Sequence, residues 1–141
     1  MRTAVVVDSG VLLAFWDPDD TQHHAAVTVL KRHVASGSRL VVPVTVLSEV
    51  LIGAYRATPY AVRSIESFVD DLISDVHPAD RAVGRTAARL RAEHPTLPLA
   101  DALLLATGEV IDAQEILTTN PRLEQVDRRV RTLAEWPSSA R

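Results

Sequence analysis

The sequence contains no cysteine, which excludes disulfide bonds, thiolate zinc sites and cysteine nucleophiles. It also has no run of 18 apolar residues, and Asp8 interrupts the first apolar stretch too early for a signal peptide. We therefore expect a cytoplasmic protein that does not enter a membrane. Any metal ion that it binds must be held by oxygen or imidazole ligands.

The motifs of several enzyme classes are absent as well. No G-x-x-x-x-G-K-[ST], G-x-G-x-x-G, G-x-S-x-G or H-E-x-x-H pattern occurs, and the histidines lack zinc-binding spacing. A haloacid-dehalogenase-type phosphotransferase needs a second acid two residues after its first, where this chain has Gly10. It also needs a late lysine, as does a response-regulator receiver domain, whereas the only lysine here is Lys31.

The composition is that of one folded domain. The 141 residues are 47% hydrophobic and 23% charged, without a low-complexity tract or a Gly/Ser linker. We expect a single domain at 1–133 and a polar tail at 134–141. The net charge of −3 argues against a broad basic surface for nucleic acid, but it allows local basic patches.

Apolar patterns predict an alternation of strands and helices. Continuous apolar runs predict strands at 3–7, 40–42, 115–118 and, more weakly, 130–133. Helical spacing predicts helices from about 21 to 36, from Pro43 to Gly53, from Pro59, after Pro78 and from Pro98. Such an alternation is typical of an α/β fold with a mostly parallel sheet.

Three acidic residues are unusually placed within this pattern. Asp8 follows the first predicted strand directly, and α/β folds bind ligands at the carboxyl ends of their strands. Glu49 and Asp101 each have mainly apolar neighbours at helical spacing, with no basic residue in register. An isolated buried carboxylate costs several kcal/mol, so each acid needs a cation, a metal ion or a proton.

Local explanations compete with a shared site. Asp8 fits equally well as the N-cap of a helix that starts directly after it. An arginine such as Arg39 or Arg122 could neutralise one acid in a salt bridge. Asn120, at the end of the strand predicted at 115–118, suits a turn before a proline. Taken together, three acids and an amide oxygen are the hard ligands that Mg²⁺ and Mn²⁺ prefer.

Two further features have two explanations each. Arg81, Arg85 and Arg89, here called the arginine stripe, lie opposite an apolar helix face. They form either a solvated surface or a guide for RNA phosphates. Phe15 and Trp16 either line a groove for a partner helix or cover the core.

Four segments resemble the acidic-site segments of PIN-domain proteins, in their usual order: VVVDSGVLLAF, VPVTVLSEVLIGAYR, LPLADALLLAT and ILTTNPRL. The opening AVVVDSGVLLAFWDPDD resembles VapC toxins of bacterial toxin–antitoxin pairs in particular. The resemblance spans residues 3 to 133. It implies an α/β fold, a PIN-like three-layer sandwich whose central, mostly parallel sheet of four to five strands is flanked by helices.

The resemblance also implies a function. VapC-like proteins are Mg²⁺- or Mn²⁺-dependent ribonucleases that cut structured RNA such as tRNA or rRNA, form homodimers and are silenced by a VapB-type antitoxin. Asp8, Glu49 and Asp101 correspond to the family's metal-binding acids. Asn120 corresponds to a fourth catalytic position that is often aspartate. This departure leaves an alternative: a PIN-like module without activity that binds RNA or a protein.

Overall fold

Strands and helices alternate along residues 2–133, the part of the chain that the computed structural model describes. The strands are β1 (Ala4–Val7), β2 (Arg39–Pro43), β3 (Asp75–His77), β4 (Glu115–Thr118) and β5 (Val130–Thr132). The helices are α1 (Ser9–Trp16), α2 (His23–Ala35), α3 (Val44–Ala57), α4 (Pro59–Leu72), α5 (Arg81–Glu93), α6 (Leu99–Val110) and a 3₁₀ turn, η1 (Pro121–Gln125). The tail predicted at 134–141 lies outside the described residues.

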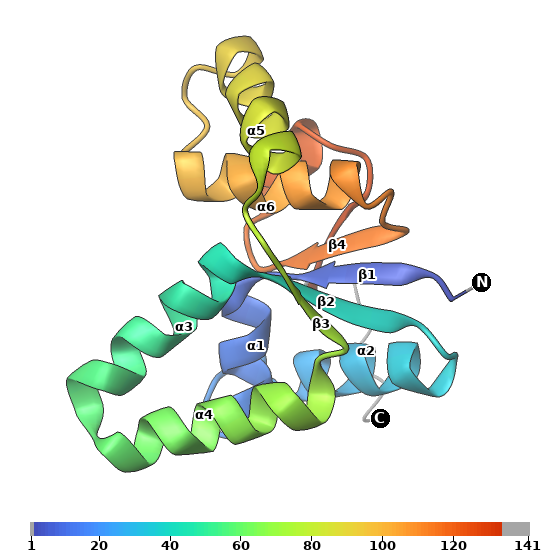
Figure 1. Cartoon of the computed structure of the whole chain (residues 1–141). Helices are drawn as coiled ribbons and strands as arrows, with labels where there is room; N and C mark the ends of the chain where they lie inside the picture. The colour runs from blue at the N-terminus through green and yellow to red at the C-terminus, as the bar shows by residue number, and fades with distance from the viewer. Residues whose placement is uncertain (1, 134–141) are drawn as a thin grey trace.

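All five strands run parallel, in the order β3-β2-β1-β4-β5. The first strand therefore lies in the centre, between β2 and β4. Helices α5 and α6 cover one face of the sheet, and α1, α2 and α4 lie on the other (Figure 1). The predicted three-layer α/β sandwich is confirmed. The order of the strands reverses beside β1, and ligands of parallel sheets bind at the carboxyl ends of the strands at such a point.

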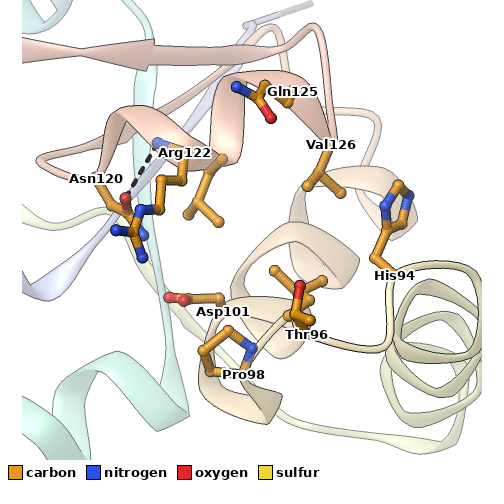
Figure 2. Close-up of a pocket in the computed structure, with 10 residues that line it drawn as sticks. His94, Thr96, Pro98, Asp101, Asn120, Arg122, Gln125 and Val126 are labelled. Atoms are coloured by element: carbon orange, nitrogen blue, oxygen red, sulfur yellow. Dashed lines mark hydrogen bonds between the residues drawn. The ribbon is translucent and has the colours of Figure 1, made fainter.

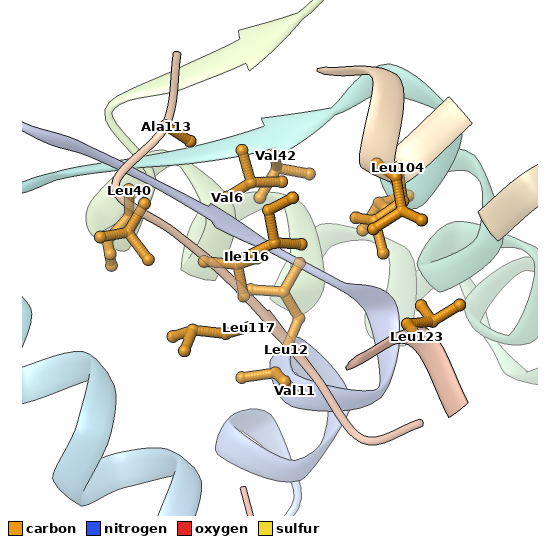
Figure 3. Packing of buried hydrophobic residues seen from close by; sticks show 14 of the residues in the cluster. Val6, Val11, Leu12, Leu40, Val42, Leu104, Ala113, Ile116, Leu117 and Leu123 are labelled. Carbon is orange, nitrogen blue, oxygen red and sulfur yellow. The ribbon is translucent and has the colours of Figure 1, made fainter. Parts of the chain in front are cut away.

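The core explains why β1 lies in the middle. Val5, Val6 and Val7 are fully buried, as expected for a strand that is covered on both faces. Side chains of β1, β2 and β4 meet those of α1 and α6 in this core (Figure 3). Helix α6 lies very close to β4, because a Cβ atom at Gly108 would come within 2.7 Å of Ile116 Cγ1. This close packing fixes the position of α6 over the sheet.

Two elements differ from the sequence prediction. Strand β3 was not predicted, because it has only three residues, pairs with β2 alone and carries no apolar run. Helix α3 continues to Ala57, beyond the end predicted at Gly53. Ala54 is 4% exposed, so its packing carries the helix past a glycine that costs roughly 1 kcal/mol.

The two aromatic residues at the end of α1 have different environments. The Phe15 ring stacks on Phe68 of α4 with centroids 5.3 Å apart, so Phe15 belongs to the packed interior. Trp16 is 38% exposed and donates one long hydrogen bond, 3.4 Å, to the Ser64 hydroxyl. Within residues 2–133, no helix has the combination of length and apolar character needed to span a bilayer.

Candidate active site

Three elements bring the predicted acids to the carboxyl edge of the sheet. Asp8 directly follows β1, Glu49 lies on α3, and Asp101 lies in the first turn of α6. Figure 1 shows the first turns of α3 and α6 at the edge where β1 and β2 end. The negative charge of Asp8 acts on both other carboxylates. Residues from three distant parts of the sequence thus share one electrostatic environment.

This environment disfavours further negative charge. Partial burial raises the pKa of Glu49, and the charges of Asp8 and Asp101 raise it further. Burial likewise raises the pKa of Asp101, with Asp8 as the second cause. In the described part of the chain, no ion pair within 4.0 Å involves any of the three acids. A cation that entered this site would therefore relieve unfavourable charge repulsion.

The alternative salt bridges are not formed. Arg39 begins β2, at the sheet edge opposite to Asp8, so it cannot reach the acids. Arg122 borders a cavity with Asp101 but forms no ion pair with it.

Both carboxylate oxygens of Asp8 accept hydrogen bonds. The Ser9 backbone N–H donates to Oδ1 at 2.7 Å, which makes Asp8 the N-cap of α1. The Thr118 hydroxyl donates to Oδ2, also at 2.7 Å. The local explanation is therefore confirmed, and it is compatible with a functional one because these bonds hold the carboxylate in a fixed orientation at the site.

Thr118 is a site residue that the sequence analysis missed. Its side chain is fully buried, and its hydroxyl also accepts the Asn120 backbone N–H at 3.1 Å. Strand register explains the contact: Val7 pairs with Leu117 across β1 and β4, so Asp8 and Thr118 are the next residues along. The hydroxyl is visible in the segment ILTTN, but its role depends on knowing which strands pair.

Asn120 has the predicted local role. Its side-chain Oδ1 accepts the Arg122 backbone N–H at 3.1 Å and caps η1. It also faces a cavity that Asp101 borders from the other side (Figure 2). The amide oxygen keeps a second lone pair and the NH₂ group forms no hydrogen bond within residues 2–133, so both ends of the Asn120 amide remain available to the site.

A sequence model of the PIN domain matches residues 5–129. The chain belongs to the PIN-domain family. This confirms the resemblance found in the four sequence segments. No curated protein shows significant sequence similarity to the chain.

Solved structures share the fold of this PIN domain. VapBC2 from Rickettsia felis, bound to a promoter DNA fragment, has a TM-score of 0.74 at 11% identity and covers 95% of this chain and 99% of its own. FitAcB from Neisseria gonorrhoeae has a TM-score of 0.75 at 15% identity, covering 93% and 99%. VapC20 from Mycobacterium tuberculosis, a sarcin–ricin loop cleaving toxin, has a TM-score of 0.67 at 16% identity, covering 95% and 97%.

The site of this PIN domain is more open than predicted. Glu49 is exposed and Asp8 and Asp101 are half-buried, so none of the three carboxylates is deeply buried, although the apolar neighbours of Glu49 and Asp101 had indicated burial. The apolar neighbours of Glu49, Val46 and Val50, are buried instead. Within residues 2–133, no three Asp, Glu or His side chains are already arranged to hold a metal ion. The donors are hard oxygens that suit Mg²⁺ or Mn²⁺, and Glu49, the exposed one of the three, is not held in place by a hydrogen bond within residues 2–133.

Part of the arginine stripe is structural. Arg89 of α5 forms hydrogen bonds of 2.8 and 2.6 Å to the two carboxylate oxygens of Glu109 on α6, and one of 3.0 Å to Glu93. It therefore joins two helices of the PIN domain. Arg81 and Arg85 are exposed.

Proposed function

We propose that this PIN domain is a Mg²⁺- or Mn²⁺-dependent endoribonuclease toxin of the VapC type. The observation that carries the proposal is the convergence of Asp8, Glu49 and Asp101 at one sheet edge, mutually repelling and without a basic partner within residues 2–133. The fold that the chain shares with VapC20, a toxin that cleaves the sarcin–ricin loop, supports a structured RNA as substrate.

The three acids have distinct roles in this proposal. Asp8, fixed by Ser9 and Thr118, provides the rigid ligand of the metal ion. Asp101 lies in the first turn of α6, where the helix dipole favours negative charge. Glu49, on its exposed side chain, completes the ligand set, and the Asn120 amide orients a water molecule. When bound, the metal ion supplies positive charge that lowers the pKa of water and stabilises charge on the phosphodiester.

The proposed chemistry does not need the 2′-hydroxyl of RNA. Cleavage by water leaves a 5′-phosphate and a 3′-hydroxyl and requires no protein nucleophile. Selection of RNA over DNA then depends on the shape of the substrate and on contacts outside the acidic site.

A VapB-type antitoxin is the proposed partner. The structures of FitAcB and VapBC2 share this fold, VapBC2 is bound to a fragment of promoter DNA, and VapBC-5 from Mycobacterium tuberculosis is described as a member of a family of toxin–antitoxin systems. An arginine of such a partner would satisfy the carboxylates in place of a metal ion. We also propose, from the family, that the chain forms a homodimer and acts in the cytoplasm.

Two substitutions test the catalytic proposal. Asp8→Asn and Asp101→Asn should abolish cleavage of tRNA and rRNA in Mg²⁺ or Mn²⁺, because each removes a negatively charged ligand. The matched control is Asp70→Asn, on the exposed face of α4, which should cleave like the wild type. Circular dichroism would verify that all variants fold. Full cleavage activity of both site variants at the Mg²⁺ concentration that the wild type needs would refute the assignment of Asp8 and Asp101 as metal ligands.

The second candidate function is a PIN-like module that binds RNA or protein without cutting it. The amide at Asn120, with its oxygen engaged by η1, is the observation in its favour. The same assay separates the candidates. Binding of RNA by the wild type without cleavage at any Mn²⁺ concentration would favour the module.

A further inference from the structure

A cavity of about 570 Å³ adjoins the acidic site. The loop at 94–98 and the first turn of α6 form one wall, and η1 forms the other, so that side chains from both walls face the space between them (Figure 2). Asp101 lies at the boundary between this cavity and the acidic site. The volume falls within the roughly 300–1,000 Å³ that is typical of small-ligand sites.

The lining has the two kinds of surface that a nucleobase requires. Pro98 and Val126 provide apolar surface against which a flat ring can pack. Thr96 and Gln125 offer polar groups that can read the edge of a base. Neither of these two side chains forms a hydrogen bond within the described residues, so their donors and acceptors are available to a ligand.

The cavity also carries a cation. Arg122 is exposed, borders the cavity and takes part in no ion pair within residues 2–133. Its backbone is held in place because its N–H donates to Asn120 Oδ1 at 3.1 Å. A guanidinium so placed beside a phosphodiester-binding site favours an anionic ligand, and phosphate in particular.

The loop wall is held in its shape before any ligand arrives. Arg91, in the last turn of α5, donates from Nε to the Leu97 carbonyl at 2.7 Å and from Nη2 to the Pro95 carbonyl at 3.1 Å. Leu97 is 5% exposed and anchors the loop in the core. The loop wall of the cavity is therefore fixed by contacts within the fold.

We propose that this cavity binds the nucleoside next to the scissile phosphate and sets the base preference of cleavage. Arg122 contacts the phosphate of that nucleoside, Pro98 and Val126 pack on its base, and Gln125 reads the base edge. The inference rests on the proposed ribonuclease function for its link to cleavage. Its binding part is independent of catalysis and can be tested separately.

Binding is tested with the four ribonucleoside 5′-monophosphates and the full-length protein by NMR titration. We expect amide shifts in residues 94–98 and 121–126, with one nucleotide binding more tightly than the others. Arg122→Ala should weaken all four nucleotides roughly tenfold, because it removes one charge-assisted contact. Gln125→Ala should weaken mainly the binding of the nucleotide that the wild type prefers. Absence of shifts in both segments at millimolar nucleotide would overturn the proposal.

Two matched controls lie elsewhere on the surface. Gln114→Ala, at the opposite edge of the sheet, and Arg63→Ala, on α4, remove the same groups from exposed positions and should leave nucleotide binding unchanged. Equal weakening by a control and by its site variant would show non-specific binding and would overturn the proposal.

Cleavage is tested by sequencing the ends of a randomised RNA pool cut by each protein. We expect a base preference beside the cut that Gln125→Ala flattens and Gln114→Ala retains. If the wild type cleaves and Gln125→Ala keeps the same preference, the cavity proposal fails while the ribonuclease function stands. If the wild type does not cleave but binds nucleotides in the cavity as described, the ribonuclease function fails while the binding site stands.

Discussion

Thr118→Val tests whether the hydroxyl beside Asp8 organises the site. Valine keeps the shape of threonine but removes the donor to Asp8 Oδ2 at 2.7 Å and the acceptor of the Asn120 N–H at 3.1 Å. A hydrogen bond to a charged group contributes about 1.5–3 kcal/mol. Adding about 0.5–1.5 kcal/mol for the backbone N–H that loses its acceptor, we expect a total loss of about 2–4.5 kcal/mol in the free energy of unfolding.

The size of this loss can be measured by thermal unfolding. For a chain of this length it corresponds to a decrease in Tm of roughly 7–15 °C. Thr118→Ser is the matched control, since it keeps the hydroxyl and loses one methyl group, at a cost of about 1 kcal/mol. The Asp8 carboxylate should also lose its orientation in the valine variant, so that Mn²⁺ affinity falls roughly 10–100-fold, as for other groups that orient metal ligands.

Two results would refute the reasoning. One is that the valine and serine variants are equally stable, because the hydroxyl would then contribute nothing. The other is that Thr118→Val binds Mn²⁺ as tightly as the serine variant, because Asp8 would then be held by Ser9 alone. Calorimetry with Mn²⁺ on the folded variants gives the second measurement.

Two further predictions concern other contacts of the fold. Gly10→Ala should lower the free energy of unfolding by about 1–3 kcal/mol, because a Cβ atom at position 10 would collide with the Thr119 hydroxyl. Gly53→Ala, which faces open space in α3, should raise it by about 0.5–1 kcal/mol. Equal changes in the free energy of unfolding of the two variants, measured in urea, would contradict this. Glu115→Gln should lose about 1 kcal/mol at pH 7, because the hydrogen bond from His33 (3.1 Å) lowers the pKa of Glu115. That contribution is fully present above the ordinary value of 4.5 and disappears as the pH falls through the lowered pKa, so a difference that persists once the pH is well below that lowered pKa would show that it has another origin.

The sequence identified the acids because their local patterns are unusual. Asp8 ends an apolar strand, and Asp101 stands alone among leucines, so both are recognisable without knowledge of distant contacts. Because α/β folds bind ligands at the carboxyl ends of their strands, the sequence also predicts where these acids lie, and in the structure the charge of Asp8 acts on Asp101. Their role as metal ligands stays a prediction.

Other features depend on contacts between distant residues and could not be predicted. Thr118 meets Asp8 only because β4 pairs with β1 in one particular register. Arg89 binds Glu109 only because α5 crosses α6, which helical periodicity does not reveal. The residues beside Glu49 in the sequence indicated an apolar helix face. Whether its carboxylate is buried depends on which other elements pack against α3, and the sequence does not show this.

The position of β1 in the centre of the sheet also determines when the site can form. Its partner β4 ends at Thr118, so the acid at position 8 cannot be fixed until a residue 110 positions later has been synthesised. Pairing between such distant parallel strands is also slow compared with helix formation. A nascent chain therefore has no organised acidic site until Thr118 has been translated, which gives the cell an interval in which most of the acids exist but their proposed activity does not.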